Sequence, residues 1–218
     1  MAPAEILETL KHSPKLPLLL DELNKYWQEE KKRGIQFYNG LNEDTKAEFI
    51  DGEIVMHSPT LDRHNEAVYL ITKLVGTFAD INSLGIVRSQ KALIQLTRND
   101  YEPDICFFSN KKAKKIHANT LLYPAPDFVV EVLSLSTVKF DKEIKFNDYE
   151  LHGIEEYWII DPSKKEVEQY LLIRGKYQLE QKIKSGNIIS RVIKGFEIPV
   201  KAIFSSKTNL EILKQLIQ

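Results

Sequence analysis

The chain has 218 residues, 43% of them hydrophobic and 10% aromatic, which is enough for one well-stocked core, so we expect a single domain over residues 1–218. Its formal net charge of −1 gives no overall attraction to nucleic acid, so any DNA-binding surface must depend on local positive charge. No apolar run approaches the roughly 18 residues of a membrane span. Glu5 and Glu8 lie where a secretory signal would be basic, and we therefore expect a cytoplasmic protein without membrane association.

The first half of the chain contains patterns typical of helix, hairpin and helix. Residues 16–33 combine leucines with the charged run EEKKR, which predicts a short amphipathic helix. The segment AEFIDGEIVM at 47–56 predicts two strands, because its central Asp-Gly readily adopts the positive φ angles of a tight turn. From the Ser-Pro-Thr sequence at 58–60, apolar residues recur at helical spacing as far as Phe78.

The second half is rich in strand patterns. These lie at GIVRSQKALIQL (85–96), DICFF (104–108), DFVVEVLS (127–134), EEYWIIDP (155–162), 166–183 and EIPVKAIF (197–204). A helix is predicted over about 139–152, ended by Gly153. This order predicts an α/β (α+β) fold with a mixed central β-sheet flanked by helices, an N-terminal helix and a β-rich C-terminal extension. The only cysteine, Cys106, lies in an apolar strand, which favours a core residue over a nucleophile.

Glu131 interrupts the apolar run FVVEVL, and a carboxylate in such a strand is normally protonated, paired or bound to a metal. Asp104 opens a neighbouring apolar strand directly after Pro103. If the two strands are adjacent, both carboxylates can meet at one site and hold a hard cation such as Mg²⁺. The alternative is a structural ion pair between Glu131 and a lysine, and these two residues alone leave both interpretations open.

Lys145 lies on the helix that follows. A period of 3.6 residues places Phe140, Ile144 and Leu151 toward the sheet, with Lys145 and Tyr149 on the flank. From there the long lysine stem could bring its ammonium toward Glu131. It could then orient an attacking water and stabilise charge on a phosphate, although a flank lysine is more often a solvated surface charge.

Five segments together resemble a known family. They are AEFIDGEIVMHSPTLDRH (47–64), EPD (102–104), PDFVVEVLSLST (126–137), DKEIKFNDY (141–149) and GIEEYWIIDP (153–162). These segments resemble the Uma family of proposed restriction endonucleases, within the PD-(D/E)XK nuclease superfamily. The resemblance covers roughly residues 47–165 and implies a restriction endonuclease-like core over that range.

The resemblance also implies roles for individual residues. Asp104 and Glu131 match the two acidic residues of the superfamily motif and would hold the metal, Mg²⁺ or Mn²⁺ in its place. The motif lysine would be residue 133, which is Leu133 here. In the Uma family, which the chain resembles, the lysine lies instead on the next helix, at the position of Lys145. The resemblance implies that Lys145 would position the nucleophile there.

Two further positions match the family pattern. Glu48 matches an acidic residue before the hairpin turn and could join the acidic cluster, or be an exposed strand glutamate. His64 matches a histidine at a helix start and shares a face with Ala67, Val68 and Ile71, so it should lie toward the sheet. A hydrogen-bonded core histidine and a catalytic histidine are both consistent with that position.

These matches imply a Mg²⁺-dependent endonuclease that hydrolyses DNA phosphodiester bonds with a metal-activated water. A homodimer is expected, because two sites related by a two-fold axis can cut both strands of a duplex. A non-cleaving nucleic-acid-binding protein and a structural or partner-binding protein are the alternatives. The basic run KKAKK at 111–115 could contact a phosphate backbone or be solvated, and Tyr157 with Trp158 is expected in the core.

Overall fold

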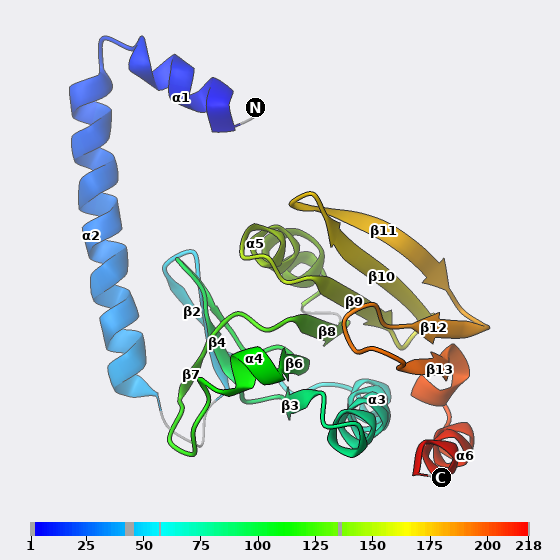
Figure 1. Ribbon diagram of the computed structural model, residues 1–218. Helices are drawn as coiled ribbons and strands as arrows, with labels where there is room; N and C mark the ends of the chain where they lie inside the picture. Colours follow the sequence, from blue (N-terminus) through cyan, green and yellow to red (C-terminus); the bar gives the residue numbers. More distant parts are fainter. Residues whose placement is uncertain (1–2, 42–45, 57, 135–136, 218) are drawn as a thin grey trace.

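A six-stranded sheet with the order β11-β10-β9-β8-β6-β3 forms the centre of the computed structural model, which describes residues 3–41, 46–56, 58–134 and 137–217 (Figure 1). Its strands are β3 (Gly85–Ser89), β6 (Ile105–Ser109), β8 (Phe128–Val132), β9 (Glu156–Asp161), β10 (Glu166–Ile173) and β11 (Lys176–Ile183). Only β8 and β9 pair in parallel, and the other pairs are antiparallel. The predicted α/β fold with a mixed sheet is confirmed.

A second sheet of five short strands, ordered β2-β1-β5-β4-β7, lies beside the first (Figure 1). It contains β1 (Ala47–Ile50), β2 (Glu53–Met56), β4 (Leu93–Gln95), β5 (Asp100–Tyr101) and β7 (Leu122–Tyr123), and a separate pair joins β12 (Asn187–Ile189) to β13 (Glu197–Pro199). The pattern at 85–96 therefore divides between two sheets. The break lies at Gln90, whose φ of 64° ends the extended backbone.

Helices cover both faces of the six-stranded sheet. The helices and helical turns of the described chain are α1 (Pro3–Lys11), α2 (Leu16–Gly40), α3 (Asp62–Ile81), α4 (Asn110–Ala113), the π-helical turn η1 (Phe140–Ile144), α5 (Lys145–Leu151), the 3-10 turn η2 (Val200–Ile203) and α6 (Ser206–Ile217). Phe128, Val130 and Trp158 share a core with α3 and η2, whereas Val129 and Tyr157 share the opposite core with α5. Since side chains alternate along β8, Glu131 faces α5.

The N-terminal and C-terminal parts differ from the predicted elements. Helix α2 continues past residue 33 because Phe37 stacks on Phe49 of β1, while its first half and α1 stand away from the sheets (Figure 1). The strand predicted over 197–204 ends at Pro199 and becomes η2. Helix α6 was not predicted. No helix in the described part of the chain is long and apolar enough to cross a membrane.

The predicted phase of the helix over 139–152 is wrong. Leu151, expected to face the sheet, is 78% exposed, whereas Lys145 and Tyr149 are buried. The cause is the π-helical turn η1, in which the N–H of Lys145 donates to the carbonyl of Phe140. This turn holds one more residue than an α-helical turn, so a strict 3.6-residue period cannot follow it. Cys106, Tyr157 and Trp158 are fully buried, as predicted.

Glu156 joins the start of β9 to the β12–β13 region. Its Oε1 accepts hydrogen bonds from the Trp158 indole at 2.6 Å and from the Gln169 amide at 2.7 Å. Its Oε2 accepts bonds from the Ser190 hydroxyl and from the backbone N–H groups of Arg191 and Val192. A fully buried carboxylate is stable in this position because all these donors point at it.

Replacing Glu156 with alanine should lower the free energy of unfolding by about 3 kcal/mol or more, because buried donors would lose their acceptor. Urea denaturation measures the change. Glu155→Ala is the matched control, since Glu155 is exposed on the preceding position. Equal stability of the two variants would show that the buried carboxylate contributes nothing to the fold.

Candidate functional site

Asp104 and Glu131 lie opposite each other on adjacent strands. Strands β6 and β8 pair Ile105 with Val130 in antiparallel register, so Asp104, one residue before β6, faces Glu131. The N–H of Val132 donates to Asp104 Oδ2 at 2.9 Å, and the N–H of Asp104 lies 3.4 Å from Glu131 Oε2. The strands are therefore adjacent, as the sequence analysis assumed, and the two carboxylates share one face.

Behind Glu131, the ammonium of Lys145 contacts three carboxylates. Its Nζ lies 2.9 Å from Glu48 Oε1, 3.0 Å from Glu131 Oε1 and 3.4 Å from Asp141 Oδ1. The hydroxyl of Tyr149 also donates to Glu131 Oε1, at 2.9 Å. All these side chains are buried. We refer to Glu48, Glu131, Asp141 and Lys145 as the lysine cluster.

The lysine cluster contains three carboxyl groups and one ammonium. Burial raises the pKa of Glu131 to about 8, although Lys145 attracts the ionised form. Burial likewise raises the pKa of Asp141. For Lys145, burial alone would lower the pKa, but Glu131, Glu48 and Asp141 together raise it well above its usual value. One ammonium thus stays charged while it cannot neutralise every carboxylate.

On its other side, Glu131 reaches a cleft of about 310 Å³. We call this the acidic cleft, lined by Lys46, Ser58, Pro59, Thr60, His64, Asn65, Gln90, Glu102, Asp104 and Glu131. His64 Nε2 lies 3.5 Å and Lys46 Nζ 4.0 Å from Asp104 Oδ1. Burial would raise the pKa of Asp104, but His64 and Lys46 lower it overall. Asp104 is therefore ionised at the surface of the cleft.

The acidic cleft suits a cation that retains water. In the described ranges, no group of three or more His, Cys, Asp and Glu side chains is arranged to hold a metal ion by itself. Asp104 and Glu131 nevertheless both line the cleft with carboxylate oxygens. Mg²⁺ is commonly bound through one or two carboxylates, with waters and substrate phosphates completing its coordination, so these residues fit it.

The structure brings all five predicted site residues close together, but only three of them line the cleft. Asp104, Glu131 and His64 line the acidic cleft, whereas Glu48 and Lys145 lie behind it. Glu48 is buried rather than exposed, and it accepts the N–H of Glu102 at 2.8 Å. His64 is buried on the sheet-facing side of α3, as predicted, and its ring contacts the Asp104 carboxylate.

Three residues of the site were missed. Asp141 and Tyr149 belong to the lysine cluster and its hydrogen bonds, and Glu102 lines the acidic cleft. The spacing of Asp141 four residues before Lys145 was an available signal for an ion pair. The basic run is elsewhere: no residue of 111–115, a range that is fully described, lines the cleft, and Lys112 pairs with Asp127 at 2.9 Å.

Comparisons with known proteins identify the family and a similar fold. Residues 34–201 match the sequence model of the Uma2 family, described as "Putative restriction endonuclease". The "Uncharacterized protein sll1609" of Synechocystis is 28% identical over 127 residues, covering 57% of this chain and 71% of that protein. A "putative nuclease belonging to DUF820" from Anabaena variabilis has a similar fold, with a TM-score of 0.66 and 16% identity over 77% of this chain and 94% of that one.

Replacing Glu131 with glutamine should change how stability depends on pH. With a folded pKa of about 8, above the ordinary value of 4.5, Glu131 binds a proton more readily in the folded than in the unfolded chain. The wild type should therefore lose stability relative to Glu131→Gln as pH rises from about 5 to about 8, by at most about 1.4 kcal/mol per pH unit.

Chemical denaturation across this pH range measures the difference. Glu143→Gln is the control, because Glu143 is exposed on the same helical segment and its variant should follow the wild type. Parallel stability curves for the wild type and Glu131→Gln would contradict the raised pKa.

Proposed function

Because the chain belongs to the Uma2 restriction endonuclease family, we propose that it is a metal-dependent DNA endonuclease acting at the acidic cleft. The observation that carries this proposal is the pair Asp104 and Glu131, held opposite each other where two strands meet the cleft. A role in DNA cleavage would explain why two carboxylates are kept together at a solvent-accessible site despite their mutual repulsion.

The residues that line the cleft have different roles in the proposed phosphodiester hydrolysis. A divalent cation held by Asp104 and Glu131 would supply a Lewis acid that activates water and offsets the charge of the scissile phosphate. Asp104 is kept ionised by His64 and Lys46, and is fixed in place by the N–H of Val132. His64 and Lys46 themselves line the cleft, where they can donate hydrogen bonds to a phosphate oxygen or a water.

Lys145 acts through Glu131 in this proposal. Its ammonium is 3.0 Å from Glu131 Oε1 and only 2% exposed, and it is not part of the wall of the cleft. It therefore orients Glu131 and compensates part of the buried charge, instead of contacting the attacking water as the family comparison implied. Tyr149 fixes the same oxygen from the helix side.

A second candidate function is DNA binding without cleavage. The burial of Lys145 behind Glu131 favours it, because superfamily lysines are expected to reach the scissile phosphate and this one does not line the cleft. Either function is compatible with a homodimer that places two clefts on one duplex.

Nicking of supercoiled plasmid tests the proposed activity. Wild type should nick plasmid with Mg²⁺ or Mn²⁺ and be inactive in EDTA. Asp104→Asn and Glu131→Gln should each lose on the order of a hundredfold or more, the usual scale for removing a preorganised charged group from a transition state. Glu143→Gln, with its exposed carboxylate, should keep full activity.

Melting temperature with and without Mn²⁺ provides the matching binding measurement. At a concentration one hundred times the dissociation constant, the cation should stabilise the wild type by about 2.7 kcal/mol, and Glu131→Gln should lose this gain. Mn²⁺-dependent stabilisation without nicking would support the binding function. Equal stabilisation of wild type and Glu131→Gln would remove Glu131 from the metal site.

Substitution of Lys145 separates its proposed role from that of a surface lysine. Lys145→Met should lose about 3 kcal/mol or more of stability, because buried carboxylates lose their counter-ion. At a temperature where circular dichroism shows it folded, nicking should still fall by on the order of a hundredfold. Lys145→Arg should regain stability better than activity, since its fork is wider than an ammonium.

Lys139→Met is the control for this experiment, because Lys139 is exposed just before η1 and its loss should change neither property. Unchanged nicking by folded Lys145→Met would rule out the positioning role, even if the protein is a nuclease.

A further inference from the structure

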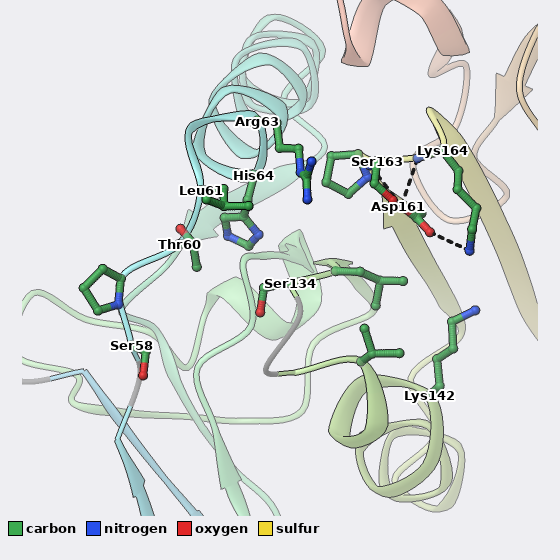
Figure 2. A pocket seen from close by; sticks show the side chains of 14 residues that line it. Ser58, Thr60, Leu61, Arg63, His64, Ser134, Lys142, Asp161, Ser163 and Lys164 are labelled. Atoms are coloured by element: carbon green, nitrogen blue, oxygen red, sulfur yellow. Dashed lines mark hydrogen bonds and ion pairs between the residues drawn. The ribbon is translucent and has the colours of Figure 1, made fainter.

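A larger pocket of about 620 Å³ lies directly beside the acidic cleft. The two hollows share Ser58, Pro59, Thr60 and His64 as a common wall. Figure 2 shows Arg63 and His64 reaching the pocket from the start of α3, Lys142 from η1, and Lys164 from the turn between β9 and β10. A chain that crosses this common wall from the acidic cleft would enter the pocket.

The pocket is cationic where the cleft is anionic. Arg63, Lys142 and Lys164 line it together with one carboxylate, that of Asp161. Lys164 pairs with Asp161 at 3.0 Å, and Lys142 pairs with Glu168 at 2.9 Å. Arg63 is exposed, and no carboxylate within the described ranges forms an ion pair with it. Arg63 therefore provides the uncompensated positive charge of the pocket.

The position of Arg63 strengthens this positive potential. It lies in the first turn of α3, a helix of 20 residues whose N-cap, Leu61, provides no side-chain hydrogen bond to the first N–H groups. The positive end of the helix dipole and the Arg63 side chain thus lie at the same end of α3, and both favour an anion. The guanidinium group of an arginine is also well suited to bind a phosphate, because it can donate two parallel hydrogen bonds.

Part of the pocket lining is apolar, and we call this part the floor. It is formed by Leu61 and Val138, which are 56% and 39% exposed, and by the more buried Leu133, with Pro59 and Pro162 beside them. A site for a phosphate alone would not need such a surface. An apolar surface together with cationic side chains suits a ligand with one anionic and one largely apolar part, and the volume is within the usual range of about 300–1,000 Å³ for small-molecule sites.

We propose that this pocket binds the nucleotide adjacent to the scissile phosphate, with its phosphate against Arg63 and its sugar and base on the floor of Leu61, Leu133 and Val138. This inference rests on the proposed function and extends it. The shared wall connects the two hollows, so consecutive nucleotides of one DNA strand occupy the pocket and the cleft. The cationic pocket then compensates for the repulsion between the backbone and the carboxylates of the cleft.

Binding of a fluorescently labelled single-stranded oligonucleotide in EDTA tests the phosphate contact without any cleavage. Arg63→Ala should raise the dissociation constant on the order of fivefold to tenfold and reduce the slope of log affinity against log salt by about 0.7 to 1. Arg174→Ala is the matched control. It removes the same charge from an exposed residue in the turn between β10 and β11, outside the pocket, and it should have little effect.

A second pair of variants tests the apolar floor. Leu61→Ser should weaken binding several-fold while leaving the salt slope unchanged, because it removes an uncharged contact. Leu121→Ser changes an equally exposed leucine outside the pocket and should bind as the wild type does. In the nicking assay, Arg63→Ala should raise KM more than it lowers kcat, since the contact is not confined to the transition state.

The outcomes separate this inference from the proposed function. If Arg63→Ala binds like Arg174→Ala, or Leu61→Ser binds like Leu121→Ser, the nucleotide pocket is wrong even when plasmid is nicked. If Arg63 and Leu61 both affect binding but no metal supports nicking, the pocket stands and the endonuclease activity is wrong. If no oligonucleotide binds although plasmid is nicked, the nucleotide pocket is overturned and the endonuclease activity stands; if the protein neither binds nor nicks, both are overturned.

Discussion

The buried ammonium of Lys145 is the interaction on which the site depends. A charge removed from water must be compensated, and here the compensation comes from three different parts of the fold. Glu48 belongs to the five-stranded sheet, Glu131 to the six-stranded sheet and Asp141 to the turn before α5. These three parts meet at Lys145, so the lysine cluster links the two sheets and the helix.

The same cluster also determines what the acidic cleft can bind. Because one ammonium contacts several carboxyl groups, Lys145 compensates the charge of Glu131 only in part. A cation in the acidic cleft, where Glu131 lies beside Asp104, would compensate the rest. Beyond the common wall the sign reverses, with Arg63 unpaired among the described residues. Negative cleft and positive pocket together match a phosphodiester chain that needs a cation at one linkage and protein charge at the next.

Much of this arrangement could be predicted from the sequence, because it depends on strand alternation. Glu131 within an apolar run and Asp104 at the start of another indicated that both could share one face if their strands were adjacent, and the structure pairs those strands. Glu48 could not be placed, because its burial follows from the contact of the five-stranded sheet with Lys145, and no local sequence pattern encodes that contact. Asp141 was missed although its i,i+4 spacing from Lys145 was an available signal, because the predicted helix placed Lys145 itself on the flank and not against Glu131.

The π-helical turn η1 also affects how such proteins can be found by sequence searches. A pattern that requires lysine two positions after Glu131 meets Leu133 and rejects this chain, although an ammonium lies 3.0 Å from the Glu131 carboxylate. The side chain is supplied from a different element, and its reach depends on one additional residue in a single turn. Deleting a residue there would restore a regular helix and rotate α5 about its axis relative to the residues before the turn. Searches for relatives should therefore compare the spatial position of the ammonium and the length of this turn, and not the strand motif alone.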